Sequence, residues 1–456
     1  MQNWQGKRIL VIGAARQGLA ASRFLAAHGA LVTLNDSHPQ QMFNDCLDSL
    51  EKLGIRCHFG GHPLELLQEI DLICVSGGVP LELPLIQAAL QKGIPLSNDS
   101  EIFMQAVPAR VLGITGSAGK TTTTTLCGEI AKAALAAPHR VWVGGNIGFP
   151  LIENLEEMQA EDWAVVEFSS FQLELMTVSP HIALVLNITP NHLDRHKTMQ
   201  AYTAAKAHIL LHQNENDFAI LNRDDPGSLS LAGQVRGRLL TFGFNPPENG
   251  EGCWLDNGEI KMKSRENISS LMPTSALHLT GRHNLANALA ACAAAYAAGF
   301  PPEAMQQGIA AVKGVPHRLE LVRERSGVRW YNDSIATAPE RVMAAVHAIQ
   351  TPLVLLLGGR DKDLPWGDLA GLLRARRPKV ILFGEAGDLI RTALLKSGVN
   401  YPLDQVSNLE DAVKKADQIA VAGESVLLSP GGTSFDAFRD FEERGECFRR
   451  LVKELP

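Results

Sequence analysis

The chain of 456 residues contains no hydrophobic run long enough to cross a membrane. Its first residues also lack the basic and apolar regions of a signal peptide. These absences predict a cytoplasmic protein with no membrane partner. The seven cysteines are dispersed and form no C-x-x-C pair, which argues against a zinc or disulfide framework and predicts reduced thiols.

An excess of basic residues is also absent. The sequence has 42 lysines and arginines against 49 acidic residues, a net charge of −7, so no nucleic-acid partner is predicted. The chain has no aromatic or basic tract of the kind that binds single strands. Its hydrophobic fraction of 45% and charged fraction of 20% are those of a folded globular protein. The length predicts two to four domains.

One stretch, residues 109–125, dominates what is present. A short apolar run at 111–114 predicts a buried strand, and the following G-S-A-G turn predicts a helix start whose N–H groups converge on an anion. Lys120 supplies a cation for the outer phosphates, and the hydroxyl of Thr121 is a hard oxygen ligand for Mg²⁺. Because Ile114 stands where the common phosphate loop has glycine, the match is to a shorter variant. The pattern predicts a site for a nucleoside triphosphate; the alternative is a glycine-rich turn with an exposed lysine.

The first hundred residues predict a small doubly wound unit. A strand at 7–13 leads into residues 13–18 (GAARQG), a G-x-G-x-x-G fingerprint with Ala15 at the middle glycine. The next strand ends at Asp36, where such folds place a carboxylate for a sugar hydroxyl. We expect a nucleotide-bearing ligand here, although a tight strand–helix connection without a ligand would show the same pattern.

Residues 162–170 predict a strand with Glu167 near its carboxyl end, and residues 140–148 predict a strand followed by a glycine turn that offers the amide of Asn146. Ligands of parallel sheets bind at these carboxyl ends, so Glu167 is placed to reach a Mg²⁺ beside Lys120, unless it is simply solvated. By spacing alone, His192 is as consistent with a structural role as with a ligand. On the same basis Lys206 is a surface lysine on a helix at 199–212.

Residues 216–273 predict a small mixed or antiparallel extension. An alanine-rich helix follows at 281–296, with Asn284 and Asn287 near its start, where they either cap the helix or contact a nucleotide.

Glycine and proline at 313–318 indicate a domain junction, and strands at 352–358, 379–383 and 424–429 predict a further doubly wound unit. Thr337 with Glu340 fits a helix capping box. We therefore predict an α/β protein of three doubly wound domains: a Rossmann-like N-terminal domain (1–98), a central phosphate-loop ATPase domain with a small extra β region (99–314) and a Rossmann-like C-terminal domain (315–456).

Together these segments resemble the Mur ligase family. The resemblance rests on the motifs at 115–122 (TGSAGKTT), Glu167, 192–194 (HLD), 281–284 (GRHN) and 317–318 (HR). The segments at 167–174 (EFSSFQLE), 331–334 (YNDS), 428–438 (LSPGGTSFDAF) and 441–445 (FEERG) are similar to those of members that add D-glutamate. The resemblance to the Mur ligase family spans nearly the whole chain.

The resemblance implies an ATP-dependent amide ligase of peptidoglycan precursor synthesis. The carboxylate of UDP-N-acetylmuramoyl-L-alanine attacks the γ-phosphate of ATP, and the amine of D-glutamate then displaces phosphate from the acyl phosphate. The family also implies a monomer and two Mg²⁺ ions.

The resemblance further assigns site residues. Lys120, Glu167, His192 and Lys206 are implied as catalytic. The implied metal ligands are Thr121, Glu167, His192 and Lys206, the last carbamylated. The implied ATP-binding residues are Gly116, Ser117, Ala118, Gly119, Lys120, Thr121, Thr122, Thr123, Asn284, Arg318 and Asp333. Those for the UDP-substrate are Arg16, Gln17, Asp36, Ser37, Gly78 and Asn146, and those for D-glutamate are Thr337, Lys362, Ser434, Phe435 and Phe441.

One position departs from the family pattern. Ile335 stands where many members carry a lysine. Either a nearby cation such as Arg360 compensates, or the pocket is built differently. Two alternatives to the D-glutamate reaction therefore stay open: another amino-acid ligase of the superfamily, acting at a different muramoyl-peptide step or on folate, and a nucleotide-binding sensor without catalysis.

Overall fold

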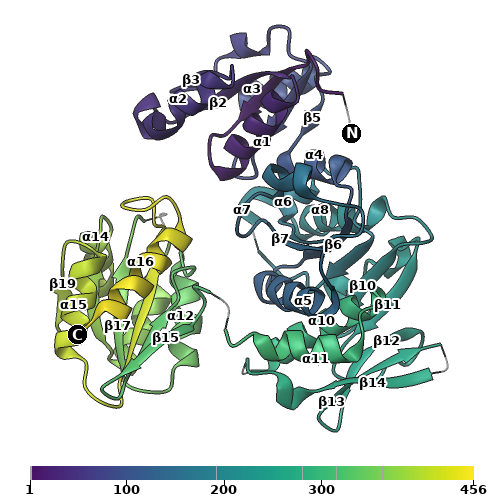
Figure 1. Ribbon diagram of the computed structural model, residues 1–456. Helices are drawn as coiled ribbons and strands as arrows, with labels where there is room; N and C mark the ends of the chain where they lie inside the picture. Colours follow the sequence, from purple (N-terminus) through teal and green to yellow (C-terminus); the bar gives the residue numbers. More distant parts are fainter. Residues whose placement is uncertain (1–2, 192, 266, 280, 315, 362–363) are drawn as a thin grey trace. The chain divides into compact units, whose positions relative to one another are not determined.

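The computed structural model describes residues 3–191, 193–265, 267–279, 281–314, 316–361 and 364–456. The chain forms two compact units, residues 1–313 and 314–456. Sheets with helices packed against them make up both units (Figure 1). Within the described ranges, no helix is both long and apolar enough to span a bilayer.

The first sheet is five-stranded and parallel. Its elements are β1 (Arg8–Ile12), α1 (Arg16–Ala27), β2 (Leu31–Asp36), α2 (Asn44–Lys52), β3 (Arg56–Phe59), β4 (Leu72–Val75), α3 (Pro84–Gln91), β5 (Leu96–Ser97) and α4 (Asp99–Ala106). The strand order is β3-β2-β1-β4-β5, so the winding reverses between β1 and β4. The carboxyl ends of strands at such a reversal are where ligands bind in this class of fold.

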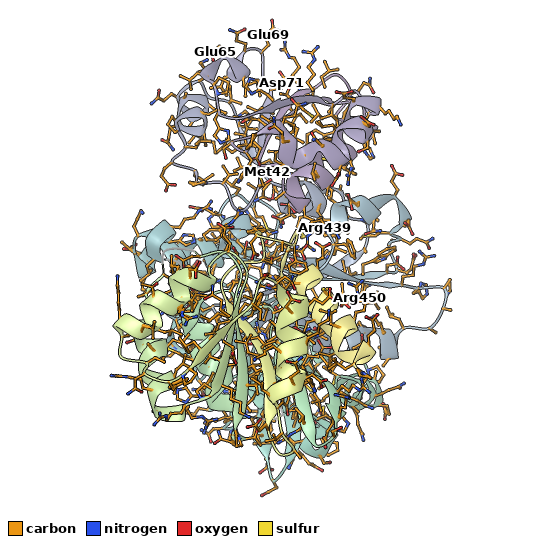
Figure 2. All side chains as sticks on the ribbon, turned by 90° about the vertical axis from the view of Figure 1, so that its left-hand side faces the viewer. Met42, Glu65, Glu69, Asp71, Arg439 and Arg450 are labelled. Carbon is orange, nitrogen blue, oxygen red and sulfur yellow. The ribbon has the colours of Figure 1, made fainter. Side chains whose placement is uncertain are left out.

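The turn after β1 explains the glycines of the fingerprint. Gly13 has a φ of +96°, and a Cβ on Gly18 would lie 1.8 Å from the Gly13 carbonyl oxygen. Both positions therefore require glycine, whereas Ala15 is accommodated at the N-cap of α1. At the other end of the strand, the side chain of Arg8 pairs with Glu69 and Asp71. Figure 2 labels these two acidic residues at the outer end of the unit.

The second sheet has nine strands and follows in the same unit. Its strands are β6 (Arg110–Thr115), β7 (Val141–Gly145), β8 (Trp163–Glu167), β9 (Ile182–Val185), β10 (Phe218–Asn222), β11 (Arg238–Phe242), β12 (Glu251–Asp256), β13 (Glu259–Ser264) and β14 (Asn267–Pro273). Its helices are α5 (Lys120–Ala134), α6 (Ser170–Leu173), α7 (Leu193–His196), α8 (Met199–Leu211), α9 (Pro226–Leu229), α10 (Arg282–Ala297) and α11 (Pro302–Ala311).

The strand order of this sheet is β14-β13-β12-β11-β10-β9-β6-β8-β7. In this order, the seven strands from β12 across to β7, including β6, pair in parallel. Strands β12, β13 and β14 pair antiparallel and form an extension at the other end of the sheet. This confirms the mixed region predicted for 216–273. Strand β6 lies between β9 and β8, with strands on both sides, so the phosphate loop leaves from the interior of the sheet and not from its edge.

Small residues bring three helices of this unit close together. The alanines at 288, 290, 291 and 293–295 of α10 are all fully or almost fully buried. A Cβ on Gly308 of α11 would lie 2.4 Å from the backbone of Ile130 in α5, so α11 approaches the α5 backbone directly. Helix α5 is thereby held by α10 and α11 as well as by the sheet. Because Lys120 is the first residue of α5, the packing of this helix also determines the position of the Lys120 backbone.

The second unit is built on a six-stranded sheet. Its elements are β15 (Glu320–Arg325), β16 (Val328–Asn332), α12 (Pro339–Ala348), β17 (Leu353–Gly358), α13 (Gly367–Arg376), β18 (Lys379–Phe383), α14 (Gly387–Lys396), β19 (Leu403–Gln405), α15 (Leu409–Ile419), β20 (Ser425–Gly431) and α16 (Phe441–Glu454). The order is β15-β16-β20-β17-β18-β19, with only β15 antiparallel.

Two hydrophobic clusters of the second unit cover the two faces of this sheet. Helices α12, α13 and α14 belong to one cluster, and α15 and α16 belong to the other. Polar side chains such as Arg450 lie on the outer side of α16 (Figure 2). The predicted α/β class with three sheets is confirmed. The predicted boundary between residues 98 and 99 stays a prediction, because residues 1–313 form one compact unit.

Candidate functional site

The phosphate loop connects β6 to α5. Gly119 has a φ of +85°, and a Cβ there would lie 2.5 Å from Asn287 Oδ1, so only glycine fits. Helix α5 begins at the next residue. Since the first N–H groups of a helix lack partners within the helix, this end of α5 presents donors and a partial positive charge. The loop has the geometry of an anion site.

The loop is anchored to the end of β9. The N–H of Ser117 donates to the Asn187 carbonyl at 2.9 Å, and the N–H of Ala118 donates to Asn187 Oδ1 at 2.8 Å. The N–H of Thr123 donates to the Gly119 carbonyl inside the helix, and the side chains of Thr122 and Thr123 are buried. The anion site therefore centres on the first turn of α5.

A hydroxyl and a carboxylate meet beside this loop. Thr121 Oγ1 donates to Glu167 Oε2 at 2.9 Å, and Asn146 Nδ2 donates to Glu167 Oε1 at 2.9 Å. Glu167 lies at the carboxyl end of β8 and is buried. Paired hard oxygen donors next to a phosphate site suit Mg²⁺, so Thr121 and Glu167 fit the metal that the sequence predicts. The alternative of a solvated carboxylate is wrong for Glu167.

Two lysines reach the same carbonyl oxygen. Lys120 Nζ donates to the Gly116 carbonyl at 3.0 Å, and Lys206 Nζ donates to it at 3.1 Å. Lys206 also donates to Thr115 Oγ1 at 3.3 Å and is only 1% exposed, so its interpretation as a surface lysine is wrong. Burial and the nearby Lys120 charge hold the pKa of Lys206 well below its usual value, against the opposing effect of Glu167.

His192, the other predicted metal ligand, lies outside the described residues. Among the residues that are described, no three His, Cys, Asp or Glu side chains gather as a metal-binding group.

Helix α10 begins beside the phosphate loop. Asn287 Nδ2 donates to Asn284 Oδ1 at 3.3 Å, and Asn287 is the residue that contacts Gly119. The N-cap of α10 is Gly281, so neither asparagine is the N-cap residue itself. Asn287 lies next to the phosphate loop, and the nucleotide contact of the two asparagines stays a prediction.

Apart from Asn146, which follows β7 of the second sheet, the residues predicted for the UDP-substrate lie at the carboxyl ends of the strands of the first sheet. Asp36 is largely engaged: its Oδ2 accepts from the Ala14 N–H at 2.7 Å, and its Oδ1 accepts from the N–H and Nδ1 of His38. Its first role is therefore to hold the turn after β1. Ser37 and Gly78 are exposed, and Gln17 Oε1 lies near Gly77.

Two arginines connect the first sheet to the second. Arg16 donates to the Gly148 carbonyl, next to the loop of Asn146. Arg195 of α7 was missed by the sequence analysis; it donates to the carbonyls of Gly77 at 3.0 Å and Val79 at 2.6 Å, on both sides of Gly78. No local pattern could have identified Arg195, because its partners are over 110 residues away in the chain.

In the second unit, Asp333 follows β16 and is buried. Its Oδ2 accepts from Ser429 Oγ at 2.8 Å and its Oδ1 accepts from the Leu319 N–H at 3.2 Å, directly after Arg318. Burial raises the pKa of Asp333 to about 6. The structure thus brings Asp333 close to the backbone that carries Arg318.

The described residues among those predicted for D-glutamate lie in the loops after β16 and β20 and at the start of α16. Ser434 is buried, and Phe435 is exposed. The carbonyl of Phe441 accepts from Ser334 Oγ at 2.8 Å. The capping-box interpretation of Thr337 is wrong, because the N-cap of α12 is Ala338 without a side-chain cap. Lys362 lies outside the described residues.

Arg444 of α16 is fully buried and was also missed. Its guanidinium donates to the carbonyls of Ser334, Gly432 and Thr433 and to the hydroxyl of Ser334. It therefore joins the two loops of the predicted amino-acid pocket. Arg360, the candidate replacement for the missing lysine, pairs its backbone with Thr433 and its side chain with Glu385 at 2.9 Å.

Three family models match the chain. They are described as the MurD-like N-terminal domain of Mur ligases (residues 7–98), the Mur ligase middle domain (114–295) and the Mur ligase glutamate ligase domain (317–432). The chain belongs to the Mur ligase family.

Curated Mur ligases match it over nearly its whole length. The UDP-N-acetylmuramoylalanine–D-glutamate ligase of Symbiobacterium thermophilum is 39% identical over 450 residues, 98% of each chain. The ligase of the same name from Geobacillus kaustophilus is 41% identical over 455 residues, covering 99% of this chain and 98% of the relative.

Solved Mur ligases share the fold at lower identity. The UDP-N-acetylmuramate–alanine ligase of Thermotoga maritima superposes with a TM-score of 0.57 at 19% identity, over 98% of this chain and 99% of that one. The MurF ligase of the same organism, solved with ADP, gives 0.53 at 16% identity, over 99% and 96%.

The Thr121–Glu167 pair makes a testable prediction for this Mur ligase. We expect Glu167→Gln to weaken Mg²⁺-dependent ATP binding and to lower kcat by about 10²-fold or more, because the neutral amide is a poor ligand for a hard cation. Titration of Mg²⁺ at fixed ATP measures the effect. Glu161→Gln, at an exposed position before the same strand, is the matched control. Equal Mg²⁺ dependence in the two variants would contradict the assignment.

Asp333 makes a prediction about pH. Its folded pKa of about 6 lies above the value near 4 of an unfolded aspartate, so between these values the folded state binds the proton more tightly. Stability therefore decreases as the pH rises from about 4 to about 6, by up to roughly 3 kcal/mol. Asp333→Asn removes this decrease and keeps an acceptor for Ser429. Urea unfolding of both proteins across this range is the measurement, and parallel curves would show that another group is responsible.

Proposed function

We propose that the chain is an ATP-dependent ligase that joins D-glutamate to UDP-N-acetylmuramoyl-L-alanine in peptidoglycan precursor synthesis. The observation that carries the proposal is the cluster of Lys120, Thr121, Glu167 and Lys206 at the start of α5 and the ends of β6 and β8. The names of the full-length relatives support the choice of substrates.

The proposed reaction has two steps. A carboxylate oxygen of the muramoyl-alanine substrate attacks the γ-phosphorus of ATP, the bond to ADP breaks, and an acyl phosphate forms. The amine of D-glutamate then attacks the acyl carbon, loses a proton, and inorganic phosphate leaves. Both partners of the first step are anions, so the ammonium of Lys120 and the N-terminus of α5 lower the repulsion between them.

Thr121 and Glu167 would hold one Mg²⁺, and His192 with a carbamylated Lys206 would hold a second. The metal supplies charge neutralisation at the phosphates when it is bound. The state of Lys206 supports the modification. An amine with a lowered pKa is available in its neutral form, which adds CO₂, and carbamylation would replace a poorly solvated cation with an oxygen ligand.

The remaining roles extend the same proposal. Asn284, Arg318 and Asp333 would bind the nucleotide. Arg16, Gln17, Ser37, Gly78 and Asn146 would contact the UDP-substrate, with Asp36 acting mainly through the turn that it holds. Thr337, Lys362, Ser434, Phe435 and Phe441 would contact D-glutamate. We also propose that the protein acts as a cytoplasmic monomer with domains at 1–98, 99–314 and 315–456.

A second candidate is the same chemistry with another amino acid. Ile335 favours it, because it removes a cation from the loop that carries Asp333, and Arg360 is engaged with Glu385. A sensor without catalysis is disfavoured by the burial of Lys206 against the phosphate loop, since nucleotide binding alone needs no second buried lysine there.

The function is tested by phosphate release from ATP in the presence of UDP-N-acetylmuramoyl-L-alanine. We expect D-glutamate to drive release, whereas L-glutamate, D-aspartate, L-lysine or no amino acid do not. Lys120→Ala should reduce the rate by about 10³-fold or more, because it removes the cation that stabilises the transferring phosphoryl group. If another amino acid drives phosphate release, that amino acid is the substrate in place of D-glutamate. If the protein binds ATP but releases no phosphate under any condition, the nucleotide-binding sensor without catalysis is favoured.

Carbamylation of Lys206 makes a separate prediction. In ¹³C-bicarbonate buffer, the wild-type protein should show a carbamate carbon signal by NMR that Lys206→Arg lacks, because a guanidinium does not add CO₂. Lys132→Arg, at an exposed lysine of α5, is the control and should keep the signal. A signal that persists in Lys206→Arg would assign the carbamate to another amine.

A further inference from the structure

The segment around Arg318 has an unusual backbone. His317 has a φ of +62° and Leu319 a φ of +43°, so both neighbours of Arg318 are in the left-handed region. Residues with a Cβ avoid this region, and such conformations persist only where the surroundings hold them. The direction of Arg318 therefore depends on the contacts of its neighbours.

His317 is buried and is held at its backbone and at its ring. Its N–H donates to Glu320 Oε2 at 2.9 Å, and its carbonyl accepts from the Ile335 N–H at 3.2 Å. Asn332 Nδ2 lies 3.0 Å from His317 Nδ1, which makes Nδ1 the acceptor and places the ring proton on Nε2, facing Glu446 at 3.5 Å. Burial lowers the pKa of His317, in agreement with a neutral ring.

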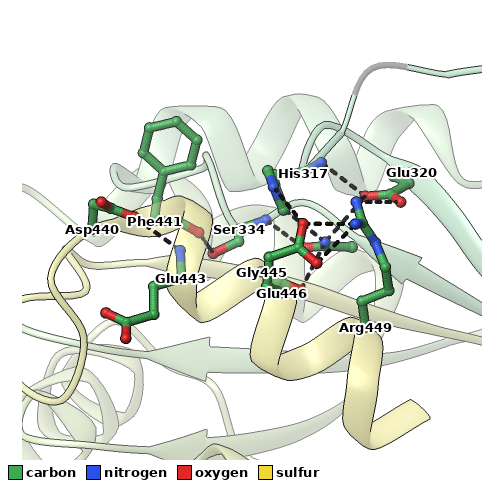
Figure 3. A network of polar contacts seen from close by, with 10 residues as sticks. His317, Glu320, Ser334, Asp440, Phe441, Glu443, Gly445, Glu446 and Arg449 are labelled. Atoms are coloured by element: carbon green, nitrogen blue, oxygen red, sulfur yellow. Dashed lines mark hydrogen bonds and ion pairs between the residues drawn. The ribbon is translucent and has the colours of Figure 1, made fainter. Parts of the chain in front are cut away.

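The ring lies against a glycine of α16. A Cβ on Gly445 would lie 2.1 Å from His317 Nδ1, so any side chain at this position would displace the ring (Figure 3). The Gly445 carbonyl also accepts from Asn332 Nδ2 at 3.2 Å. Alanine forms helices better than glycine, so glycine at this position of α16 is explained by the ring and not by the helix.

An ion-pair network closes this arrangement. Arg449, one turn along α16 from Gly445, contacts Glu320 at 2.8 Å and Glu446 at 2.6 Å (Figure 3). Glu320 is also the acceptor for the His317 N–H. The helix thus contacts the His317 ring directly and is joined to the His317 backbone N–H through Glu320.

We infer that His317 is a positioning residue: packed against Gly445, it fixes the left-handed backbone that presents Arg318 beside Asp333. The Leu319 N–H bond to Asp333 supports this, because it joins the same segment to the carboxylate. The inference rests on the proposed role of Arg318 and Asp333 in nucleotide binding.

A double-mutant cycle on the full chain tests the inference. Gly445→Ala and His317→Ala should each weaken binding of Mg-ADP, measured by calorimetry, by about tenfold, while the KM for D-glutamate changes by less than about twofold. The double variant should bind no more weakly than His317→Ala alone, because the new methyl group has no ring to displace. Gly371→Ala, in α13 with open space around it, and His347→Ala, at an exposed site, are matched controls.

A third variant separates positioning from folding. Asn tolerates positive φ and keeps an acceptor for Asn332, so His317→Asn should restore part of the nucleotide affinity lost in His317→Ala. Two results would overturn the inference. One is a double variant in which the losses of Mg-ADP affinity of the two single variants multiply, and the other is unchanged Mg-ADP binding in single variants that fold. Because calorimetry needs no amino-acid substrate, it still decides the inference if D-glutamate drives no phosphate release.

Discussion

The carbonyl oxygen of Gly116 accepts hydrogen bonds from two ammonium groups, those of Lys120 and Lys206. Burial disfavours the charged form of Lys206, and the nearby charge of Lys120 disfavours it further, while Glu167 opposes both effects. The lowered pKa of Lys206 is the direct result. The surrounding unit maintains this arrangement: α5 is held by α10 and α11, and the loop is anchored by Asn187. The arrangement of Lys120, Thr121 and Glu167 suits a triphosphate with its metal.

The second unit uses one helix to organise two loops. Arg444 of α16 holds the loops that carry Ser334 and Thr433, and the next residue, Gly445, receives the ring of His317. Adjacent positions on α16 therefore act on the predicted amino-acid pocket and on the segment of Arg318. The Arg444 guanidinium is buried and donates to carbonyl and hydroxyl oxygens of both loops, so moving either loop would leave buried donors unsatisfied.

Most of the fold could be predicted because predicted strands and helices alternate along the sequence and glycines mark the turns between them. Gly18 and Gly119 are required by contacts within a few ångströms, and their spacing is visible in the chain. Partners distant in the sequence were not predictable. Nothing local indicates that Arg195 reaches the carbonyls around Gly78, or that Lys206 is buried on a helix with an ordinary composition. The capping interpretation of Thr337 failed because the chain at Ala338 enters α12 without a side-chain cap.

In the proposed amino-acid pocket, the choice of amino acid depends on positive charge near the loops after β16 and β20. A dicarboxylate needs cations or many donors, and Ile335 removes one cation that many Mur ligases have. Arg360 lies beside Thr433 but is half-exposed and paired with Glu385, so it must exchange that partner to meet a ligand. The guanidinium of Arg444 is hydrogen-bonded to the loops themselves. Burial lowers the pKa of Arg444 to about 10, and the nearby Asp436 opposes this effect only in part. In the proposed reaction, by contrast, the residues at the phosphate loop belong to the other unit, so a change of amino-acid substrate would leave the Lys120–Glu167 site intact.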